Sequence, residues 1–136
     1  MSACDKPIDI CLWRPQTGDI QPVDTTTAWN FQQGARLQWL PGQPDTLVFN
    51  AIENGQPVAV LRNVSSGERR VLPAPIYVIT PDGKTSISPN FTSLAHRWKA
   101  YGYTALAEKP LITDPEADGL WELDIETGKE RLFIST

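Results

Sequence analysis

Basic residues are scarce in this sequence of 136 residues. It has 12 lysines and arginines against 16 aspartates and glutamates, which gives a formal net charge of −4 at pH 7. Nucleic-acid binding depends on clustered Lys and Arg side chains, because each phosphate contact releases counterions. The densest basic run is only Arg69-Arg70. We therefore expect no nucleic-acid partner.

Cysteine and histidine are also rare, with Cys4, Cys11 and one histidine, His96, in the whole chain. A zinc site needs a closely spaced set of Cys and His ligands, which these residues do not provide. The acidic segment 114–122 fits part of a calcium-loop pattern, but Ile125 stands where that loop needs a bidentate carboxylate. We therefore expect no metal and no cofactor.

Long apolar runs are absent as well. No stretch approaches about 18 consecutive apolar residues, and the first ten residues, MSACDKPIDI, lack the basic and apolar regions of a secretion signal. The sequence predicts no membrane segment and a cytoplasmic location. The content of 40% hydrophobic and 21% charged residues is typical of one globular domain over residues 1–136, while 12 prolines and 9 glycines disfavour long helices.

One pattern occurs three times along the chain. An alternating apolar run leads into a Thr-Gly or Ser-Gly turn and then a second run, in IDICLWRPQTGDIQPV, VAVLRNVSSGERRVL and GLWELDIETGKERLFI. This pattern predicts a β-hairpin whose turn glycine, Gly18, Gly67 or Gly128, has a positive φ. Two further hairpins are predicted at Pro-Gly and Pro-Asp-Gly turns near Gly42 and Gly83.

Together these hairpins predict an all-β protein of about ten strands, arranged as antiparallel four-stranded meanders. The predicted strands are 8–14, 19–25, 35–40, 46–52, 57–64, 68–73, 76–80, 84–90, 119–125 and 130–135. They form a half unit (8–25), one unit (35–73) and a second unit (76–135) that contains an insertion at 91–118. A β-sandwich of the same strands is the alternative, because meander and Greek-key orders look alike in sequence.

The turn motifs resemble those of the TolB-like and WD40-like β-propellers. The best matches are Thr80-Pro81-Asp82-Gly83-Lys84 and Asp124-Ile125-Glu126-Thr127-Gly128-Lys129-Glu130-Arg131-Leu132. The resemblance implies propeller blades, but only about two and a half of them, where a closed propeller has about four to eight. Such an incomplete propeller leaves strand edges open, so we expect a homo-oligomer that forms through the open blade edges.

In a meander, successive turns alternate between the two ends, so the loop 26–34 and the insertion 91–118 are expected at the same end. The resemblance implies that ligands bind on this face. The candidate ligand-binding residues are Trp29, Asn30, Gln32, Gln33, His96, Arg97, Trp98 and Tyr101. Their aromatic rings would stack on a carbohydrate or peptide while the polar groups hydrogen-bond to it. The alternatives are that Trp29 and Phe31 cap the core, and that the insertion is a lid or an oligomer contact.

The sequence thus favours a non-catalytic binding or interaction module, and no catalytic residue is assigned. One alternative is a carbohydrate-active enzyme similar to the oligogalacturonate lyases, with His96 as acid or base and Arg97 holding an anionic substrate. That resemblance implies a metal site built from several histidines, which one histidine cannot reproduce. A third hypothesis is that the protein is a self-assembly unit that completes a propeller ring.

Overall fold

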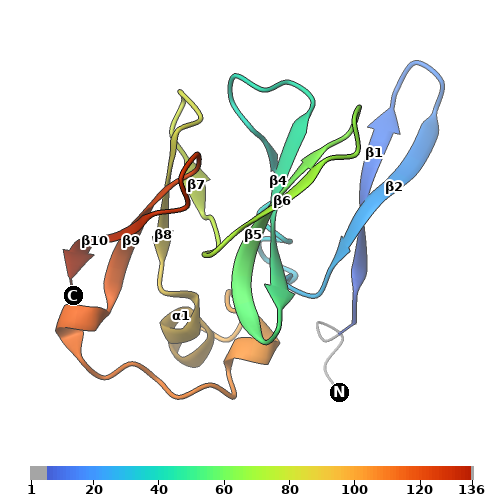
Figure 1. Cartoon of the computed structure of the whole chain (residues 1–136). Coiled ribbons are helices and arrows are strands. Elements are labelled where there is room, and N and C mark those ends of the chain that lie inside the picture. The colour runs from blue at the N-terminus through green and yellow to red at the C-terminus, as the bar shows by residue number, and fades with distance from the viewer. Residues whose placement is uncertain (1–5, 136) are drawn as a thin grey trace.

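The computed structural model describes residues 6–135 as three antiparallel β-sheets and one short α-helix (Figure 1). Cys4 lies outside the described residues. The N-terminal hairpin contains β1 (Ile8–Arg14) and β2 (Asp19–Thr26). The central sheet contains β3 (Gln38–Trp39), β4 (Thr46–Glu53), β5 (Gln56–Asn63) and β6 (Arg69–Leu72), and the C-terminal sheet contains β7 (Val78–Ile79), β8 (Thr85–Pro89), β9 (Gly119–Asp124) and β10 (Glu130–Ser135).

Strands that are neighbours in sequence are also neighbours in these sheets. The order is β3-β4-β5-β6 in the central sheet and β10-β9-β8-β7 in the C-terminal sheet, which is the order of a meander and not of a Greek key. The prediction of an all-β protein with antiparallel sheets is confirmed. All ten predicted strands form.

Two of the strands are much shorter than predicted, since β3 and β7 have two residues each in place of 35–40 and 76–80. Arg36 has a φ of 56°, a conformation that no strand contains. Its guanidinium donates hydrogen bonds of 3.1 and 2.6 Å to the carbonyl oxygen of Tyr77 and lies 3.9 Å from the centre of that ring. The chain is therefore not a strand at residue 36. Instead, the Arg36 side chain joins the segment before β3 of the central sheet to the segment before β7 of the C-terminal sheet.

The three repeated hairpins share one turn geometry. Gly18, Gly67 and Gly128 have φ values of 79°, 80° and 74°. Each donates its backbone N–H to the carbonyl oxygen four residues earlier, at 2.8, 2.9 and 2.8 Å. The positive φ predicted for these glycines is confirmed, and the sequence repeat corresponds to three equivalent structural turns.

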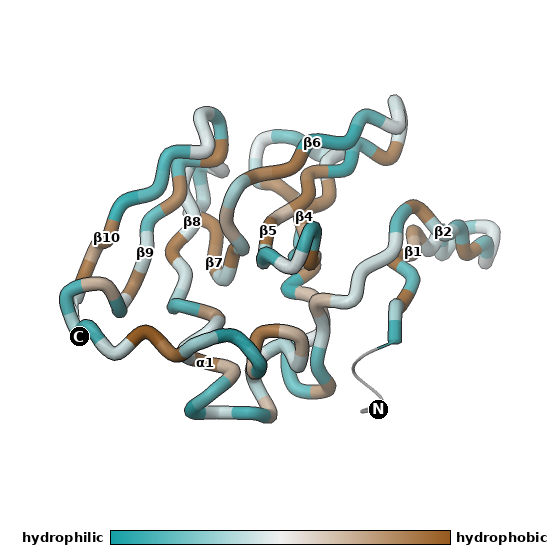
Figure 2. The backbone as a smooth tube through the Cα atoms, turned by 60° about the horizontal axis from the view of Figure 1, so that its bottom comes forward, coloured by the Kyte–Doolittle hydropathy of each residue, from teal (hydrophilic) through white to brown (hydrophobic). Residues whose placement is uncertain are grey.

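The central sheet is buried on both faces. Val48 packs with Ile79 and Leu123 in a cluster shared with the C-terminal sheet, whereas Phe49 packs with Ile10 in a cluster shared with the N-terminal hairpin. A strand covered on both sides needs apolar residues on both sides, so β4 begins with the continuous run Thr-Leu-Val-Phe. Figure 2 shows hydrophobic residues concentrated on inner strands such as β5 and hydrophilic residues on the hairpin turns.

The two ends of the sheets carry different structures (Figure 1). The turns that close the β1–β2, β3–β4, β5–β6, β7–β8 and β9–β10 hairpins gather at one end. The β4–β5 turn and the insertion lie at the other, where the insertion forms α1 (Phe91–Arg97), η2 (Thr104–Leu106) and η3 (Pro115–Ala117). The loop 26–34 contacts the insertion through a hydrogen bond from Asn30 to Tyr101. These two segments thus share one end, as the alternation of turns predicts. No helix within residues 6–135 has the length and apolar composition needed to cross a membrane.

Candidate functional site

The insertion is packed firmly onto the sheets. Helix α1 begins after Asn90, whose side-chain oxygen accepts hydrogen bonds from two backbone N–H groups of the first turn. The ring of Phe91 stacks on Tyr103 with a centroid distance of 5.0 Å. Gly102 passes so close to the helix that a Cβ atom there would lie 2.2 Å from the Cα of Ala95. The insertion is therefore an integral cover of this end of the sheets.

The polar residues of the loop 26–34 hold the loop in shape. Asn30 is only 5% exposed, and its Oδ1 accepts the backbone N–H groups of Gln32 at 3.0 Å and Gln33 at 2.8 Å. Its Nδ2 donates to the carbonyl oxygen of Tyr101 at 3.0 Å, and Gln33 Nε2 donates to the Tyr77 hydroxyl at 2.9 Å. The structure brings these predicted site residues together, but it commits Asn30 to internal contacts.

The two aromatic residues of this loop differ in exposure. Trp29 is partly buried against the core beneath the N-terminal hairpin, and its Nε1 donates to the carbonyl oxygen of Lys6 at 2.7 Å. Phe31 meets Trp29 edge-on, with centroids 5.1 Å apart, and remains 76% exposed. Trp29 thus caps the core, whereas Phe31 is available at the surface.

His96 lies inside the insertion and does not face an open cleft. Its Nε2 is 2.6 Å from the carbonyl oxygen of Lys109, a distance that requires this nitrogen to carry the proton and donate it. In this tautomer Nε2 has no lone pair to offer a substrate, and Nδ1 is the ring nitrogen that keeps one. The geometry therefore assigns His96 the task of holding α1 against the segment that follows η2.

Replacement of His96 tests this assignment. We expect His96→Ala to lower the free energy of unfolding by about 1–2 kcal/mol, because the carbonyl oxygen of Lys109 loses its donor. Amide hydrogen exchange should accelerate in residues 104–110 and change little in β4 and β5. Lys99→Ala, at an exposed position on the same segment, is the control and should leave exchange unchanged. An equal loss of protection across both sheets would contradict a local anchoring role.

Arg97 is paired with the buried carboxylate of Asp118, which was not among the predicted site residues. The guanidinium lies 3.5 Å from Oδ2 of Asp118, which is 5% exposed. The same oxygen accepts a hydrogen bond of 2.9 Å from Ser93 Oγ, and Oδ1 accepts the N–H of Gly119 at 2.9 Å. Asp118 thereby joins α1 to the start of β9, and Arg97 is held at the surface beside it.

The acidic segment 114–122 does not form a cation loop. Asp114 Oδ1 accepts the N–H of Glu116 at 2.9 Å and opens η3, and Asp118 turns toward α1. In the part of the chain that the structure describes, no three His, Cys, Asp or Glu side chains gather closely enough to hold a metal ion.

An apolar groove lies between α1 and the end of the C-terminal sheet, with a volume of about 240 Å³. Its walls are Pro89, Asn90, Ser93, Leu94, Arg97, Trp98, Asp118, Gly119, Leu120, Ile134 and Ser135. Trp98 is 64% exposed and Ile134 is 53% exposed, so large apolar side chains border open solvent. Of the eight predicted site residues, Arg97 and Trp98 line this groove.

The groove continues the outward face of the C-terminal sheet. Residues opposite one another on paired strands share a face, and Pro89 pairs with Leu120, which pairs with Ile134. The next row runs from Val78 through Ile87 to Glu122 and Arg131, which form an ion pair. The outward face of this sheet is therefore apolar at the end beside α1 and charged further along, so the apolar surface is confined to the groove.

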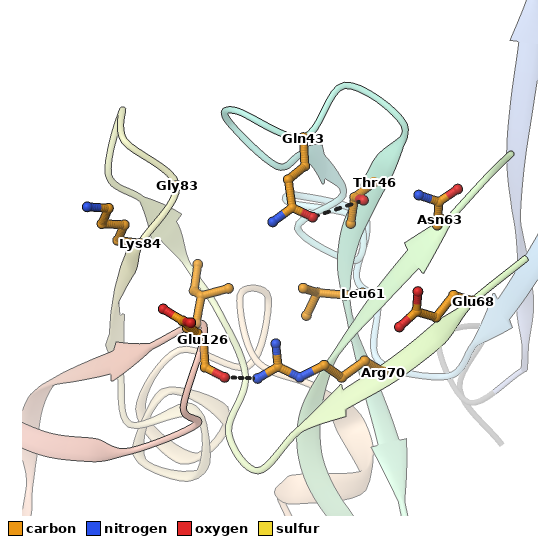
Figure 3. Close-up of a pocket in the computed structure, with 10 residues that line it drawn as sticks. Gln43, Thr46, Leu61, Asn63, Glu68, Arg70, Gly83, Lys84 and Glu126 are labelled. Atoms are coloured by element: carbon orange, nitrogen blue, oxygen red, sulfur yellow. Dashed lines mark hydrogen bonds between the residues drawn. The ribbon is translucent and has the colours of Figure 1, made fainter. Parts of the chain in front are cut away.

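A second cavity, of about 330 Å³, lies at the hairpin-turn end, between the central and C-terminal sheets (Figure 3). Arg70 reaches across from β6 and donates a hydrogen bond to the carbonyl oxygen of Glu126. Lys84 and Glu68 lie at opposite sides of this space, and Leu61 lies between them. Its lining has two cations and two carboxylates, so it has no net charge to select one class of ion.

Asn50 connects more elements than any predicted site residue, and sequence reasoning missed it. It is fully buried in β4, and its Nδ2 donates to Tyr103 Oη at 2.7 Å and to the carbonyl oxygen of Ile76 at 2.8 Å. Its Oδ1 accepts the N–H of Ile76 at 2.8 Å. Burial raises the pKa of the Tyr103 phenol, against the opposing effect of the Asn50 hydrogen bond. The sequence feature that could have identified this residue is an asparagine within the apolar run of β4, because a buried polar side chain needs hydrogen-bond partners.

No protein-family model matches the sequence, and no curated protein is significantly similar to it. The resemblance to propeller blades therefore depends on the turn motifs, and the function has to be argued from the surface of the chain.

Proposed function

We propose that this chain is a non-catalytic interaction module built from β-propeller-type blades, two whole and one half, and that it binds apolar protein surface in the groove beside α1. The observation that carries the proposal is the apolar groove beside α1, which is lined by Leu94, Trp98, Leu120 and Ile134.

The chemistry of the groove favours a protein partner over a carbohydrate. Sugar binding relies on many polar groups directed at hydroxyls, whereas a protein interface has an apolar centre with a polar rim. Here Trp98 and Ile134 supply apolar surface and Arg97 stands at the rim. Tryptophan and arginine are also the residues most often found to dominate interface energetics.

The remaining predicted residues support an interaction module more than an enzyme. His96 is committed to the carbonyl oxygen of Lys109, and Arg97 is paired with Asp118. An enzyme of the carbohydrate-active kind would need a free acid or base beside a polar cleft. The geometry offers an exposed cation and an indole beside apolar side chains, which is a recognition surface.

A peptide library displayed on phage and selected against the chain tests the proposal. We expect enrichment of peptides with aromatic or large aliphatic residues, with saturable binding. Ile134→Lys should weaken this binding about tenfold or more, since it places a charge in the apolar centre. The control is Phe31→Lys, which makes the same kind of change at an exposed residue of the same end, outside the groove.

Two results would contradict the proposal. One is peptide binding that Ile134→Lys leaves unchanged, which would place recognition elsewhere. The other is saturable binding to a glycan array that depends on Phe31 and Gln32, which would favour carbohydrate recognition on the loop 26–34. Far-UV circular dichroism of each variant confirms that the sheets remain folded.

A further inference from the structure

The N-terminal hairpin has two strands, whereas the other two sheets have four each (Figure 1). In those sheets the strand that enters the repeated turn, β5 or β9, is paired on both of its edges. β1 enters the equivalent turn at Gly18, but within residues 6–135 it pairs only with β2. The other edge of β1 is therefore the place where an inner strand lies in the two four-stranded sheets.

The turn geometry shows which backbone groups lie on this open edge of β1. The carbonyl oxygen of Arg14, the last residue of β1, accepts the N–H of Gly18, so the backbone groups of Arg14 are directed toward β2. Backbone groups alternate between the two edges of a strand, so those of Trp13 and Cys11 are directed away from β2. In the described part of the chain, no other segment forms a hydrogen bond with them. The open edge thus has unpaired N–H and carbonyl groups at both residues.

The outer edge of β2 differs from the open edge of β1. Pro22 lies opposite Cys11, so its nitrogen is directed away from β1, and a proline has no N–H to donate. A proline in this position is one of the features that prevent another strand from pairing with an edge. One edge of the hairpin is therefore closed to a further strand, and the other is available.

The central sheet has uncovered apolar surface on the face that is turned toward the hairpin. Trp39 pairs with Leu47 and shares this face with it, but Leu47 is 4% exposed and Trp39 is 47% exposed. Ile79 is the equivalent of Trp39 in the C-terminal sheet, since the next residues, Leu40 and Thr80, both donate their N–H across the following turn at 2.8 Å. Ile79 is only 8% exposed, because the four-stranded central sheet covers it. The two-stranded hairpin is too narrow to cover Trp39.

A strand added to the open edge would lie over Trp39. β2 lies over the β6 side of the central sheet, where Asp24 forms an ion pair of 3.1 Å with Arg69. β1 lies over β4 and β5, because Ile10 packs in one cluster with residues of those strands. The strand order of the central sheet is β3-β4-β5-β6, so the next position beyond β1 lies over β3, which contains Trp39.

We propose that the open edge of β1 binds an extended strand of a partner protein, which widens the hairpin and covers Trp39. The backbone of the added strand pairs with Cys11 and Trp13, and its alternate side chains pack on Trp39. The strand runs antiparallel to β1, as β8 runs to β9, so the hairpin turns stay at one end. The contact continues both the β1–β2 ladder and the packing of the hairpin on the central sheet. This surface is separate from the groove beside α1.

The surroundings of the edge favour a strand of another protein over a whole second copy. Antiparallel strands related by a two-fold axis form one sheet in which equivalent residues of both copies face the same side. Both central sheets would then lie on that side, where the β3 edge of each chain already lies over the place of the added strand. A single strand has no such obstacle. Trp13 is 62% exposed on the other face of β1, so the strand that fits has apolar side chains on both faces.

The first experiment uses a fluorescent synthetic peptide of residues 76–90 as the probe. This segment forms β7 and β8, the inner strands of the C-terminal sheet, so it has the shape of the strands that the hairpin lacks. Fluorescence anisotropy should show saturable binding to the whole chain. Trp39→Lys should weaken it about tenfold or more, because it puts a charge into the covered face. Leu111→Lys, at a residue of the insertion that is 39% exposed, should leave binding unchanged.

The second experiment removes a hydrogen-bond donor from the open edge. Cys11→Pro should also weaken peptide binding about tenfold or more, whereas Cys11→Ala should preserve it, because only the proline lacks the N–H. Val71→Pro is the matched control, since Val71 lies opposite Val60 with its N–H on the outer edge of β6. Far-UV circular dichroism checks the fold of each variant.

A change in the peptide tests the same hydrogen bonds without any change in the chain. Ser88 pairs with Trp121 of β9, which is equivalent to Cys11 in its distance from the turn. Methylation of the backbone nitrogen of Ser88 should therefore abolish binding. Full binding of the methylated peptide would overturn strand pairing at this edge.

Other outcomes distinguish this site from the groove and from self-association. Peptide binding that Ile134→Lys abolishes and Trp39→Lys leaves unchanged would place the peptide in the groove and overturn the strand site, while the proposed function would stand. Sedimentation equilibrium without peptide gives the mass of the chain. A dimer that Cys11→Pro dissociates would show that a second copy occupies the edge and would overturn a separate partner.

Discussion

Asn50→Ala should unfold this protein more readily than any other single change in the central sheet. The substitution removes both hydrogen bonds to the backbone of Ile76 and the one to Tyr103 Oη. Each buried partner left unsatisfied costs about 1–3 kcal/mol, so we expect a loss of roughly 3–5 kcal/mol in the free energy of unfolding. Urea unfolding followed by tryptophan fluorescence measures it.

The effect should be large because Asn50 joins three parts of the fold. From β4 its side chain reaches both the segment before β7 and the insertion, whereas the hydrogen bond that its backbone carbonyl accepts from Thr26 Oγ1 is kept in the alanine variant. Loss of Asn50 therefore loosens the contact between the sheets as well as the cover above them.

Tyr103→Phe is the matched comparison for this prediction. It removes only the hydroxyl from the same network and keeps the ring that stacks on Phe91. We expect a loss of about 1–2 kcal/mol. Because the two residues share one hydrogen bond, the double variant should lose less than the sum of the two single losses. Strict additivity would show that the network does not act as a unit.

Local patterns in the sequence predicted the strands because these elements depend on neighbours along the chain. The alternation in β1 and the turn glycines Gly18, Gly67 and Gly128 each act within a few residues. The inner strands β4 and β5 were also predicted close to their observed bounds, since a strand covered on both faces is apolar on both. The same local reasoning failed at Arg36, where a contact with Tyr77, far away in sequence, set the backbone.

The candidate site was predicted less well because side-chain contacts across the chain decide which residues remain available. Asn30, His96 and Trp29 suited ligand binding by residue type, but each is committed to a backbone carbonyl of a distant segment. Arg97 and Trp98 remain at the surface, beside Leu120 and Ile134, which no motif marked. A groove between a helix and a sheet end has no sequence signature, because its two walls lie far apart in the chain.

The start of β9 offers the second large effect, through Gly119. This glycine has a φ of 149°, which an L side chain rarely adopts, and a Cβ atom added to it would lie 1.9 Å from the carbonyl oxygen of Ile134. We expect Gly119→Ala to lower the free energy of unfolding by roughly 2–4 kcal/mol, because it combines backbone strain with a clash against β10. Thermal unfolding measures this loss.

Gly42→Ala is the comparison without a clash. Gly42 also has a positive φ, 80°, but a Cβ atom there would meet nothing within 4 Å. Its substitution should therefore cost only backbone strain, about 1 kcal/mol. The additional loss in Gly119→Ala contains both the clash with Ile134 and the greater backbone strain at a φ of 149°.

The same comparison bears on the groove, because both Gly119 and Ile134 line it, whereas Gly42 lies in a turn at the other end. A shift of β10 should displace Ile134 and weaken peptide binding in Gly119→Ala, under conditions where the variant is still folded. Gly42→Ala should leave peptide binding unchanged. If Gly119→Ala were destabilised yet kept full binding, the edge of the C-terminal sheet would not be the surface that partners contact.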